Sequence, residues 1–142
     1  MIIQEFVDLR ILLVDDSKMT RHLALGLLKE FGINEVYQVP NAAKAIKILE
    51  KNYKEKTPFD LIFTDINMPG LNGVELLRKI KEHRIFGKTP IIMMSSVGDQ
   101  DTILQAVDHG ADEYIIKPIT AEKLEEKIKK VFPVIKSNRS KA

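Results

Sequence analysis

Short apolar runs and longer amphipathic segments alternate along the chain. The short runs predict strands, because each is bounded by polar or turn-forming residues. They cover residues 10–14, 34–39, 59–64, 90–94 and 113–116. The segments between them carry apolar residues at helical spacing, which predicts helices. These cover residues 18–31, 42–51, 73–80, about 100–109 and 121–132.

Several residues mark the ends of these helices. Gly32 follows the first helix, where a glycine commonly ends a helix in the left-handed conformation. Asn41 is placed to cap the second helix with its side chain. Asn72 and Glu75 have the spacing of a capping box at the start of the third. Proline cannot donate the backbone hydrogen bond that a helix interior requires, so Pro133 is expected to end the last helix.

The two ends of the chain give weaker signals. Residues 1–8 contain apolar side chains that either pack on an edge of the fold or fray. Residues 134–142 are polar and basic, and are expected to be loose. A length of 142 residues suits one domain. The sequence therefore predicts a single domain over 1–142 with its core at about 9–132.

The order of elements predicts the fold class. Five strands that alternate with five helices are typical of an α/β fold, a doubly wound parallel sheet with helices on both faces and right-handed crossovers. In a parallel sheet the carboxyl ends of all strands lie at one edge, where such folds bind ligands. Polar groups follow four of the five predicted strands: Asp15 and Asp16, Asp65, Ser95, and Lys117. These side chains are expected to converge.

Composition excludes several classes of function. The chain has no cysteine, which excludes disulfides, thiolate metal sites and cysteine nucleophiles. The net charge of +2 gives little attraction to nucleic acid. No apolar run approaches the ~20 residues of a membrane span, and the N-terminus lacks the features of a signal peptide. A cytoplasmic protein is expected.

The converging side chains predict phosphoryl chemistry. Three carboxylates that meet at one edge repel one another unless a cation lies between them, and Mg²⁺ prefers such oxygen ligands together with a phosphoryl oxygen. Asp65 is the natural nucleophile, because a carboxylate can form an acyl phosphate. Lys117 supplies a further positive charge, and the hydroxyl of Ser95 can donate to a phosphoryl oxygen. Its neighbour Ser96 is the alternative, and the spacing from Asp65 and Lys117 favours Ser95.

These motifs, in this order and spacing, resemble the response-regulator receiver domain of two-component signalling, above all the stand-alone chemotaxis-type (CheY-like) regulators. The resemblance covers roughly residues 9–132. The residues that carry it are Val14, Asp15 and Asp16; Asp65, Ile66, Asn67, Met68 and Pro69, followed by Asn72 and Gly73; Met94 and Ser95; and Tyr114, Lys117 and Pro118.

The resemblance implies a flavodoxin-like sheet of strand order 2-1-3-4-5 and a phosphoryl group transferred to Asp65 from a histidine kinase. It implies that Asp16, Asp65 and the backbone carbonyl of Asn67 bind Mg²⁺, with Asp15 acting through water. It also implies contact between Lys117 and the phosphoryl group. The peptide bond before Pro118 is expected to be cis, a form that is far less unfavourable before proline than elsewhere.

The resemblance further implies a switch formed by Ser95 and Tyr114. Its output is expected to be docking of another protein on the face made by the helix at 100–109, strand 113–116 and the last helix, with Ile103 and Lys127 exposed there. Fewer than ten residues follow Pro133, too few for a helix-turn-helix, so no direct binding of nucleic acid is expected. The protein is expected to be a monomer or a phosphorylation-dependent dimer. It is not expected to be an enzyme beyond its own phosphorylation and dephosphorylation.

Two other functions compete with this interpretation. An aspartyl-phosphate phosphatase or phosphotransferase acting on a small substrate typically carries a second aspartate two residues after the nucleophile, where this chain has Asn67. A flavin binder needs a phosphate-binding loop after the first strand. Asp15 and Asp16 in that place would repel phosphate. The receiver interpretation is favoured over both.

Overall fold

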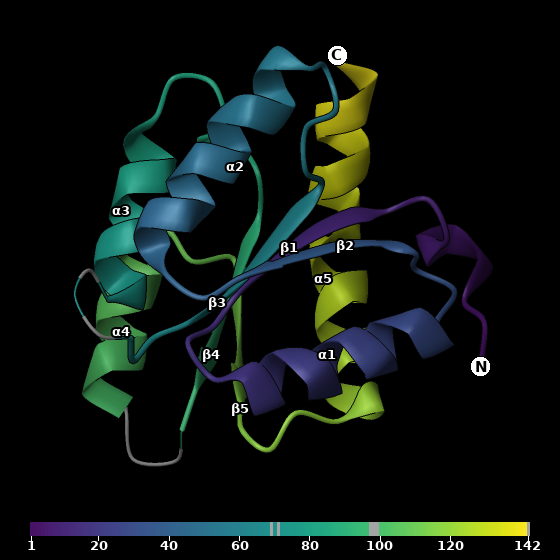
Figure 1. The fold of residues 1–142 in the computed structure, drawn as a ribbon, viewed down its shortest axis with the longest axis horizontal. Coiled ribbons are helices and arrows are strands. Elements are labelled where there is room, and N and C mark those ends of the chain that lie inside the picture. Colours follow the sequence, from purple (N-terminus) through teal and green to yellow (C-terminus); the bar gives the residue numbers. More distant parts are fainter. Residues whose placement is uncertain (69, 71, 97–99, 142) are drawn as a thin grey trace.

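The structure is a computed structural model that describes residues 1–68, 70, 72–96 and 100–141. Its strands form one parallel sheet in the order β2-β1-β3-β4-β5, which confirms the predicted fold (Figure 1). The strands are β1 (Arg10–Val14), β2 (Glu35–Val39), β3 (Leu61–Asp65), β4 (Ile91–Ser95) and β5 (Glu113–Ile116). The central strands β1, β3 and β4 are almost entirely buried, as their continuous apolar runs require.

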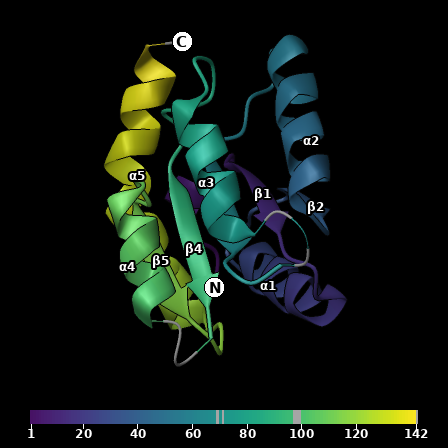
Figure 2. The ribbon, with the colours of Figure 1, turned by 90° about the vertical axis from the view of Figure 1, so that its left-hand side faces the viewer.

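Helices cover both faces of the sheet. On one face lie α1 (Lys18–Glu30) and α5 (Ala121–Ser140), and on the other lie α2 (Ala42–Lys54), α3 (Gly73–Glu82) and α4 (Gln100–Asp108) (Figure 2). A short 3-10 turn, η1 (Gln4–Phe6), precedes β1. No helix among the described residues is both long and apolar enough to cross a lipid bilayer.

The sheet divides the hydrophobic core into two clusters. Ile11 and Leu13 of β1 belong to the cluster under α1 and α5, whereas Leu12 and Val14 belong to the cluster under α2 and α3. All four side chains are at most 1% exposed. Burying an aliphatic side chain of this size contributes about 1.5–3 kcal/mol. Both clusters therefore fix β1 in place, together with the acidic residues that follow it.

The helix ends follow the signals in the sequence. The side chain of Asn41 accepts a hydrogen bond from the backbone N–H of Lys44, 2.9 Å away. Asn72 and Glu75 form the predicted capping box at the start of α3. Gly32 has a φ of 92°, the left-handed conformation expected after α1.

The prediction that Pro133 ends the last helix is wrong, because α5 continues through Pro133 to Ser140. A proline in a helix removes one backbone hydrogen bond, but tertiary contacts beyond it offset that loss. Ile135 is 1% exposed within the core. Arg139 pairs with Asp60 at 2.7 Å and with Asp8 at 3.2 Å. Residues 134–140 are therefore packed rather than loose.

The N-terminal residues also pack against the core, which resolves the alternative that the sequence left open. The backbone N–H of Ile3 donates to the carbonyl of Phe31 at 2.9 Å. Phe6 is fully buried, and its ring lies 6.2 Å from that of Phe31 and 5.8 Å from that of Phe132. This aromatic group joins η1 to α1 and α5.

Candidate functional site

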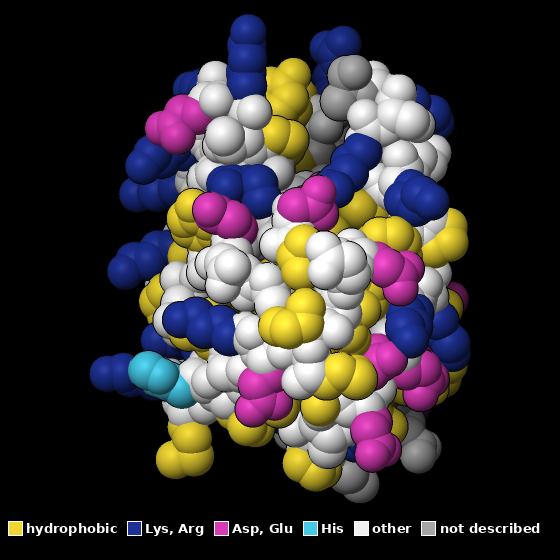
Figure 3. Space-filling view, turned by 90° about the vertical axis from the view of Figure 1, so that its right-hand side faces the viewer, with side chains coloured by type: hydrophobic (Ala, Val, Ile, Leu, Met, Phe, Trp, Pro, Cys, Tyr) yellow, Lys and Arg dark blue, Asp and Glu magenta, His cyan; other side chains and the backbone are white. Residues whose placement is uncertain are grey.

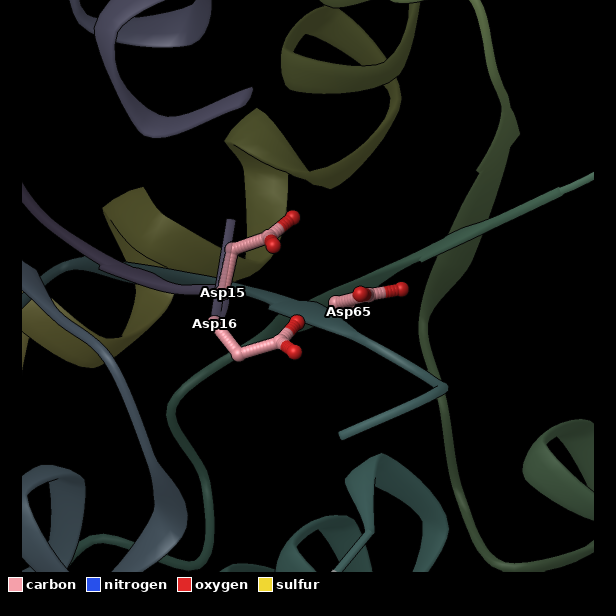
Figure 4. Close-up of side chains that lie close together, drawn as sticks. All are labelled: Asp15, Asp16 and Asp65. Atoms are coloured by element: carbon pink, nitrogen blue, oxygen red, sulfur yellow. The ribbon is translucent and has the colours of Figure 1, made fainter. Parts of the chain in front are cut away.

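Three carboxylates meet at the carboxyl edge of the sheet. Asp15 and Asp16 follow β1, and Asp65 ends β3, the neighbouring strand (Figure 4). One oxygen from each carboxylate lies within 4.8 Å of an oxygen from the other two. Asp15 and Asp65 are buried, whereas Asp16 is exposed. The structure thus brings together the acidic residues that the sequence singled out.

Lys117 brings a positive charge to this group from the turn after β5. Its Nζ lies 3.4 Å from Oδ2 of Asp15 and 3.5 Å from Oδ2 of Asp65. Its backbone N–H donates to the carbonyl of Ser95 at 2.7 Å, which fixes the start of the turn against the end of β4. With one lysine among three aspartates, the group keeps a net charge of −2 when all four side chains are ionised.

Local hydrogen bonds hold the two acidic loops. Oδ1 of Asp15 accepts from the backbone N–H of Ser17 at 2.8 Å, and Ser17 in turn caps α1. Nη1 of Arg21 donates to the carbonyl of Asp15 at 2.6 Å. Oδ1 of Asp65 accepts from the backbone N–H of Asn67 at 3.3 Å. These bonds orient the carboxylates before any ligand is present.

Glycine lets α3 approach the end of β3. The backbone N–H of Gly73 donates to the carbonyl of Ile66 at 2.9 Å. A Cβ at position 73 would clash with the backbone carbonyl of Asp65. Gly73 therefore allows the start of α3 to pack directly against the turn that carries Asp65.

The pKa of Asp65 is raised from 3.8 to about 6. Burial is the largest cause, because it disfavours the charged form, and repulsion by Asp15 adds to it. The charge of Lys117 and the hydrogen bonds from Asn67 and Lys117 lower the pKa, but they do not cancel the increase. The carboxylate is ionised at neutral pH, although its charge is unfavourable there, and a further cation nearby would relieve it.

The donor set fits a hard divalent cation. Asp15, Asp16 and Asp65 offer carboxylate oxygens to one volume, and Mg²⁺ binds through one or two carboxylates together with water and phosphoryl oxygens. Cysteine is absent from the chain, and the cluster contains no histidine, so it lacks the softer ligands that select zinc or copper. The acidic pocket is thus of a kind that suits Mg²⁺.

Ser95 lies beside these carboxylates, and its hydroxyl makes no hydrogen bond to the described residues. Met94 pairs with Asp65 across the sheet, so Ser95 is the next residue of β4. The side chain is fully buried, and its Oγ has no hydrogen-bond partner among the described residues. A buried hydroxyl without a partner is unfavourable by roughly 1–3 kcal/mol. The hydroxyl is therefore available to donate to an acceptor that binds beside Asp65.

Tyr114 lies on the same face of the sheet as Ser95. It pairs with Met93, which alternates with Ser95 along β4 and belongs to the cluster under α2, α3 and α4. The side chain is 39% exposed, and Nζ of Lys127 lies 5.0 Å from its ring centroid. The ring therefore lies near the surface, on the face of the sheet that also carries Ser95.

The remaining residues that the sequence singled out differ in how well the structure matches the expectation. Asn67 is exposed next to Asp65, and the Lys117-Pro118 peptide bond is cis. Pro69 lies outside the described residues. The prediction that Ile103 and Lys127 are exposed is wrong, because both are half-buried. Ile103 packs against the core, and Lys127 pairs with Glu113 at 2.8 Å.

Sequence reasoning missed three residues that hold the site. Ser17 and Arg21 support the loop at Asp15, and the N-cap preference for serine could have identified Ser17. Nζ of Lys123 donates to the carbonyls of Ile116 and Pro118 at 2.8 and 3.0 Å, on either side of Lys117. No helix, strand or cap signal indicates that bond, because its acceptors are backbone carbonyls of the turn seven and five residues earlier.

Comparisons with known proteins all point to one family. The sequence matches the response regulator receiver domain over residues 11–129. It is 33% identical over 125 residues to the chemotaxis protein CheY-3 of Vibrio cholerae, in an alignment that covers 88% of this chain and 92% of that protein. It is 32% identical over 124 residues to the chemotaxis protein CheY of Pseudomonas aeruginosa, in an alignment that covers 87% of this chain and 96% of that protein. A receiver domain structure from Clostridium thermocellum is similar with a TM-score of 0.80 at 30% identity, covering 95% of this chain and all of that one.

Proposed function

The chain belongs to the response regulator receiver domain family of two-component systems, and on this premise we propose that Asp65 accepts a phosphoryl group from a histidine kinase. The phosphorylated protein then signals by docking to another protein. We also propose that residues 1–142 form one domain and that the protein acts in the cytoplasm. Sequence and geometry support this proposal at Asp65 itself, a buried carboxylate 3.5 Å from Lys117 at an edge that also carries Asp15 and Asp16.

The transfer forms one bond and breaks one. An oxygen of the Asp65 carboxylate attacks the phosphorus of a phosphohistidine, and the bond from phosphorus to the histidine nitrogen breaks with its electron pair on nitrogen. The attacking carboxylate must be ionised, which its pKa of about 6 allows at neutral pH. Lys117 lies close enough to balance charge on the phosphoryl oxygens. Asp15, Asp16, Asp65 and the carbonyl of Asn67 would hold Mg²⁺, which when bound supplies further positive charge against those oxygens.

The unused hydroxyl of Ser95 supports a switch. A phosphoryl group on Asp65 would offer an acceptor beside β4. The hydroxyl of Ser95 has no hydrogen-bond partner among the described residues, and it would gain one there. Such a contact favours one conformation only if it is made in that conformation alone. We propose that Ser95 turns towards the phosphoryl group and that Tyr114 moves inward. The surface of α4, β5 and α5 would then change for a downstream protein.

A phosphatase or phosphotransferase acting on a small substrate is not favoured. Asn67 stands two residues after Asp65, and its carboxamide does not exchange protons near neutral pH as an acid–base residue must. We propose that the chemistry of the site is confined to phosphorylation and dephosphorylation of its own aspartate.

Phosphorylation with acetyl phosphate and Mg²⁺ tests the proposal. Wild type should gain the mass of one phosphoryl group, labile to hydroxylamine, and Asp65→Asn should gain none. Asp101→Asn is the matched control, because Asp101 is an exposed acid on α4. Hydroxylamine-labile labelling of Asp65→Asn at the wild-type level would show that another residue is the acceptor.

A further inference from the structure

A second pocket lies at the opposite edge of the sheet from Asp65. Phe59 and Asp60, just before β3, and Lys88 and Thr89, just before β4, contribute to its lining. The end of α2, the connection from α3 to β4 and the last turns of α5 surround it, and all three lie at one end of the molecule (Figures 1 and 2). Its volume is about 390 Å³. This is within the range of about 300–1,000 Å³ that small-molecule sites occupy.

The floor of the pocket is apolar and held in place. Leu49, Phe59, Phe86 and Ile135 are each at most 7% exposed. The ring of Phe59 meets that of Tyr37 edge to face at 5.5 Å. The ring of Phe86 stacks on His83, with centroids 3.8 Å apart. A floor fixed by such contacts is largely preformed, as small-molecule sites usually are.

The rim is positively charged. Lys88, Arg139 and Lys141 line the pocket together with one acid, Asp60, which leaves a net charge of +2. Both carboxylate oxygens of Asp60 accept hydrogen bonds from Arg139, at 2.7 and 2.8 Å, so the charges of these two side chains are paired with each other. Lys88 and Lys141 have no ion pair among the described residues. At the top of the space-filling view, hydrophobic side chains lie in a hollow with Lys and Arg side chains around it (Figure 3).

We propose that this pocket binds an amphipathic small-molecule anion. The aromatic or aliphatic body of the ligand lies on the floor between Phe59 and Phe86, and its carboxylate, sulfonate or phosphate group meets Lys88 and Lys141. Thr89 and Asn138 also line the pocket, and Nδ2 of Asn138 donates to the carbonyl of Lys88 at 2.8 Å. A helix from a partner protein would need a groove that follows several turns. Here three elements surround a compact hollow, which favours a small molecule.

The pocket depends on the part of α5 beyond Pro133. Ile135, Arg139 and Lys141 form its wall on that side, whereas the match to the receiver family ends at residue 129. The pocket therefore combines residues of the matched region with residues that lie beyond it. It uses none of the residues that surround Asp65, so it is independent of the proposed phosphorylation.

Two dyes of matched shape test the proposal on the full chain. 1-Anilinonaphthalene-8-sulfonate carries an anionic group, and N-phenyl-1-naphthylamine has the same rings without it. The anionic dye should bind at least about tenfold more tightly, because its sulfonate can accept charge-assisted hydrogen bonds from Lys88 and Lys141. NMR should place it by shifts in the backbone amides of Tyr53, Ile85 and Asn138. Competition by decanoate and by decyl phosphate then distinguishes a carboxylate ligand from a phosphate ligand.

Variants of the rim distinguish binding in this pocket from binding elsewhere on the surface. Lys88→Gln combined with Lys141→Gln should remove most of the preference for the anionic dye, and Ile85→Glu, which adds an acid at an exposed rim position, should weaken it further. Lys130→Gln is the control, because Lys130 is exposed on α5 outside the pocket. All these variants should still be phosphorylated at Asp65, and Asp65→Asn should bind the dye normally. Equal affinity for both dyes, shifts centred on α4, or unchanged binding by the double variant would each overturn the proposal.

Discussion

The ammonium nitrogen of Lys117 lies 3.5 Å from Oδ2 of Asp65, yet the pKa of this aspartate is raised rather than lowered. Burial and the neighbouring Asp15 disfavour the negative charge by more than Lys117 favours it. Without a further cation, the folded protein therefore holds an unfavourable charge at neutral pH. This charge links stability, pH and ligand binding at one residue.

Replacing Asp65 by asparagine should stabilise the metal-free protein at neutral pH. The folded pKa of about 6 exceeds the ordinary 3.8, so the folded state binds more protons between these values. Stability from Asp65 is thus full below pH 3.8 and is lost as pH rises through 6. Asp65→Asn should exceed wild type by roughly 2–3 kcal/mol at about pH 7.5. Urea unfolding with a chelator should show this difference shrinking between about pH 6 and pH 4. A difference that does not vary with pH would contradict the role of the charge.

Asp16 should matter for the metal and little for the fold. It is exposed, and no hydrogen bond or ion pair joins its side chain to another residue in the part of the chain described. Asp16→Ala should therefore keep or slightly raise stability without metal, because it relieves repulsion with Asp15 and Asp65. In wild type, Mg²⁺ should raise the melting temperature as its concentration increases. The variant should need at least about tenfold more Mg²⁺ for the same rise, the equivalent of losing about 1.4 kcal/mol of binding free energy. Asp101→Ala serves as the control, and an unchanged response of Asp16→Ala would remove Asp16 from the metal site.

Ser95→Ala should separate phosphorylation from its consequence. Among the described residues the buried Oγ has no hydrogen-bond partner, so its removal should leave stability equal or raise it by up to about 1 kcal/mol. Acetyl phosphate should still label Asp65. The NMR shifts of the Tyr114 ring and of amides in α4 that accompany phosphorylation should disappear. If the variant shows the wild-type shifts, the coupling does not pass through Ser95.

The sequence predicted the site because a parallel sheet brings its strand ends together. Each of these four residues lies at the carboxyl end of a strand or directly after it, so strand order brings them to the same edge of the sheet: Asp15, Asp65, Ser95 and Lys117. The resemblance to receiver domains drawn from these residues is confirmed by the family match. Local signals such as the capping box at Asn72 were equally readable, because both partners lie within one turn of helix.

The sequence failed where distant contacts decide the structure. At Pro133 the local rule predicted the end of a helix, and contacts of Ile135 and Arg139 with the core and with Asp60 overrode it. The burial of Phe6 depends in the same way on Phe132 at the other end of the chain. No pattern within a few residues reveals such pairs. The pocket beside α5 could not be predicted for this reason.

Arg139→Ala should destabilise the protein more than an ordinary surface substitution. It removes the pair of hydrogen bonds to Asp60, whose side chain is only 12% exposed. The loss should be about 1–3 kcal/mol, because a largely buried acid loses its charged partner and keeps only the hydrogen bond from the backbone N–H of Arg10. Hydrogen exchange should quicken at residues 134–140. Lys129→Ala is the matched control on the same helix, since its pair with Glu125 is exposed to solvent and adds little to stability. Equal losses for the two variants would show that Arg139 does not anchor the end of α5.

Lys123 should act as a positioning residue for Lys117. Its ammonium group donates to the carbonyls of Ile116 and Pro118, which flank Lys117 in the turn after β5. Lys123→Met keeps the length of the side chain but has no donor, so the turn should hold Lys117 less firmly. Phosphorylation by acetyl phosphate should slow by about tenfold, which corresponds to about 1.4 kcal/mol of lost positioning.

Metal binding distinguishes positioning from general damage. The proposed acidic ligands follow β1 and end β3, whereas Lys123 is in the first turn of α5, so the affinity of Lys123→Met for Mg²⁺ should match that of wild type. Lys130→Met is the control, because Lys130 forms an exposed pair with Glu126. A substitution that merely disturbed the fold would weaken Mg²⁺ binding and phosphorylation together. That joint loss would contradict a positioning role, because Lys123 donates to the carbonyls of Ile116 and Pro118, which flank Lys117. An unchanged rate of phosphorylation would contradict it as well.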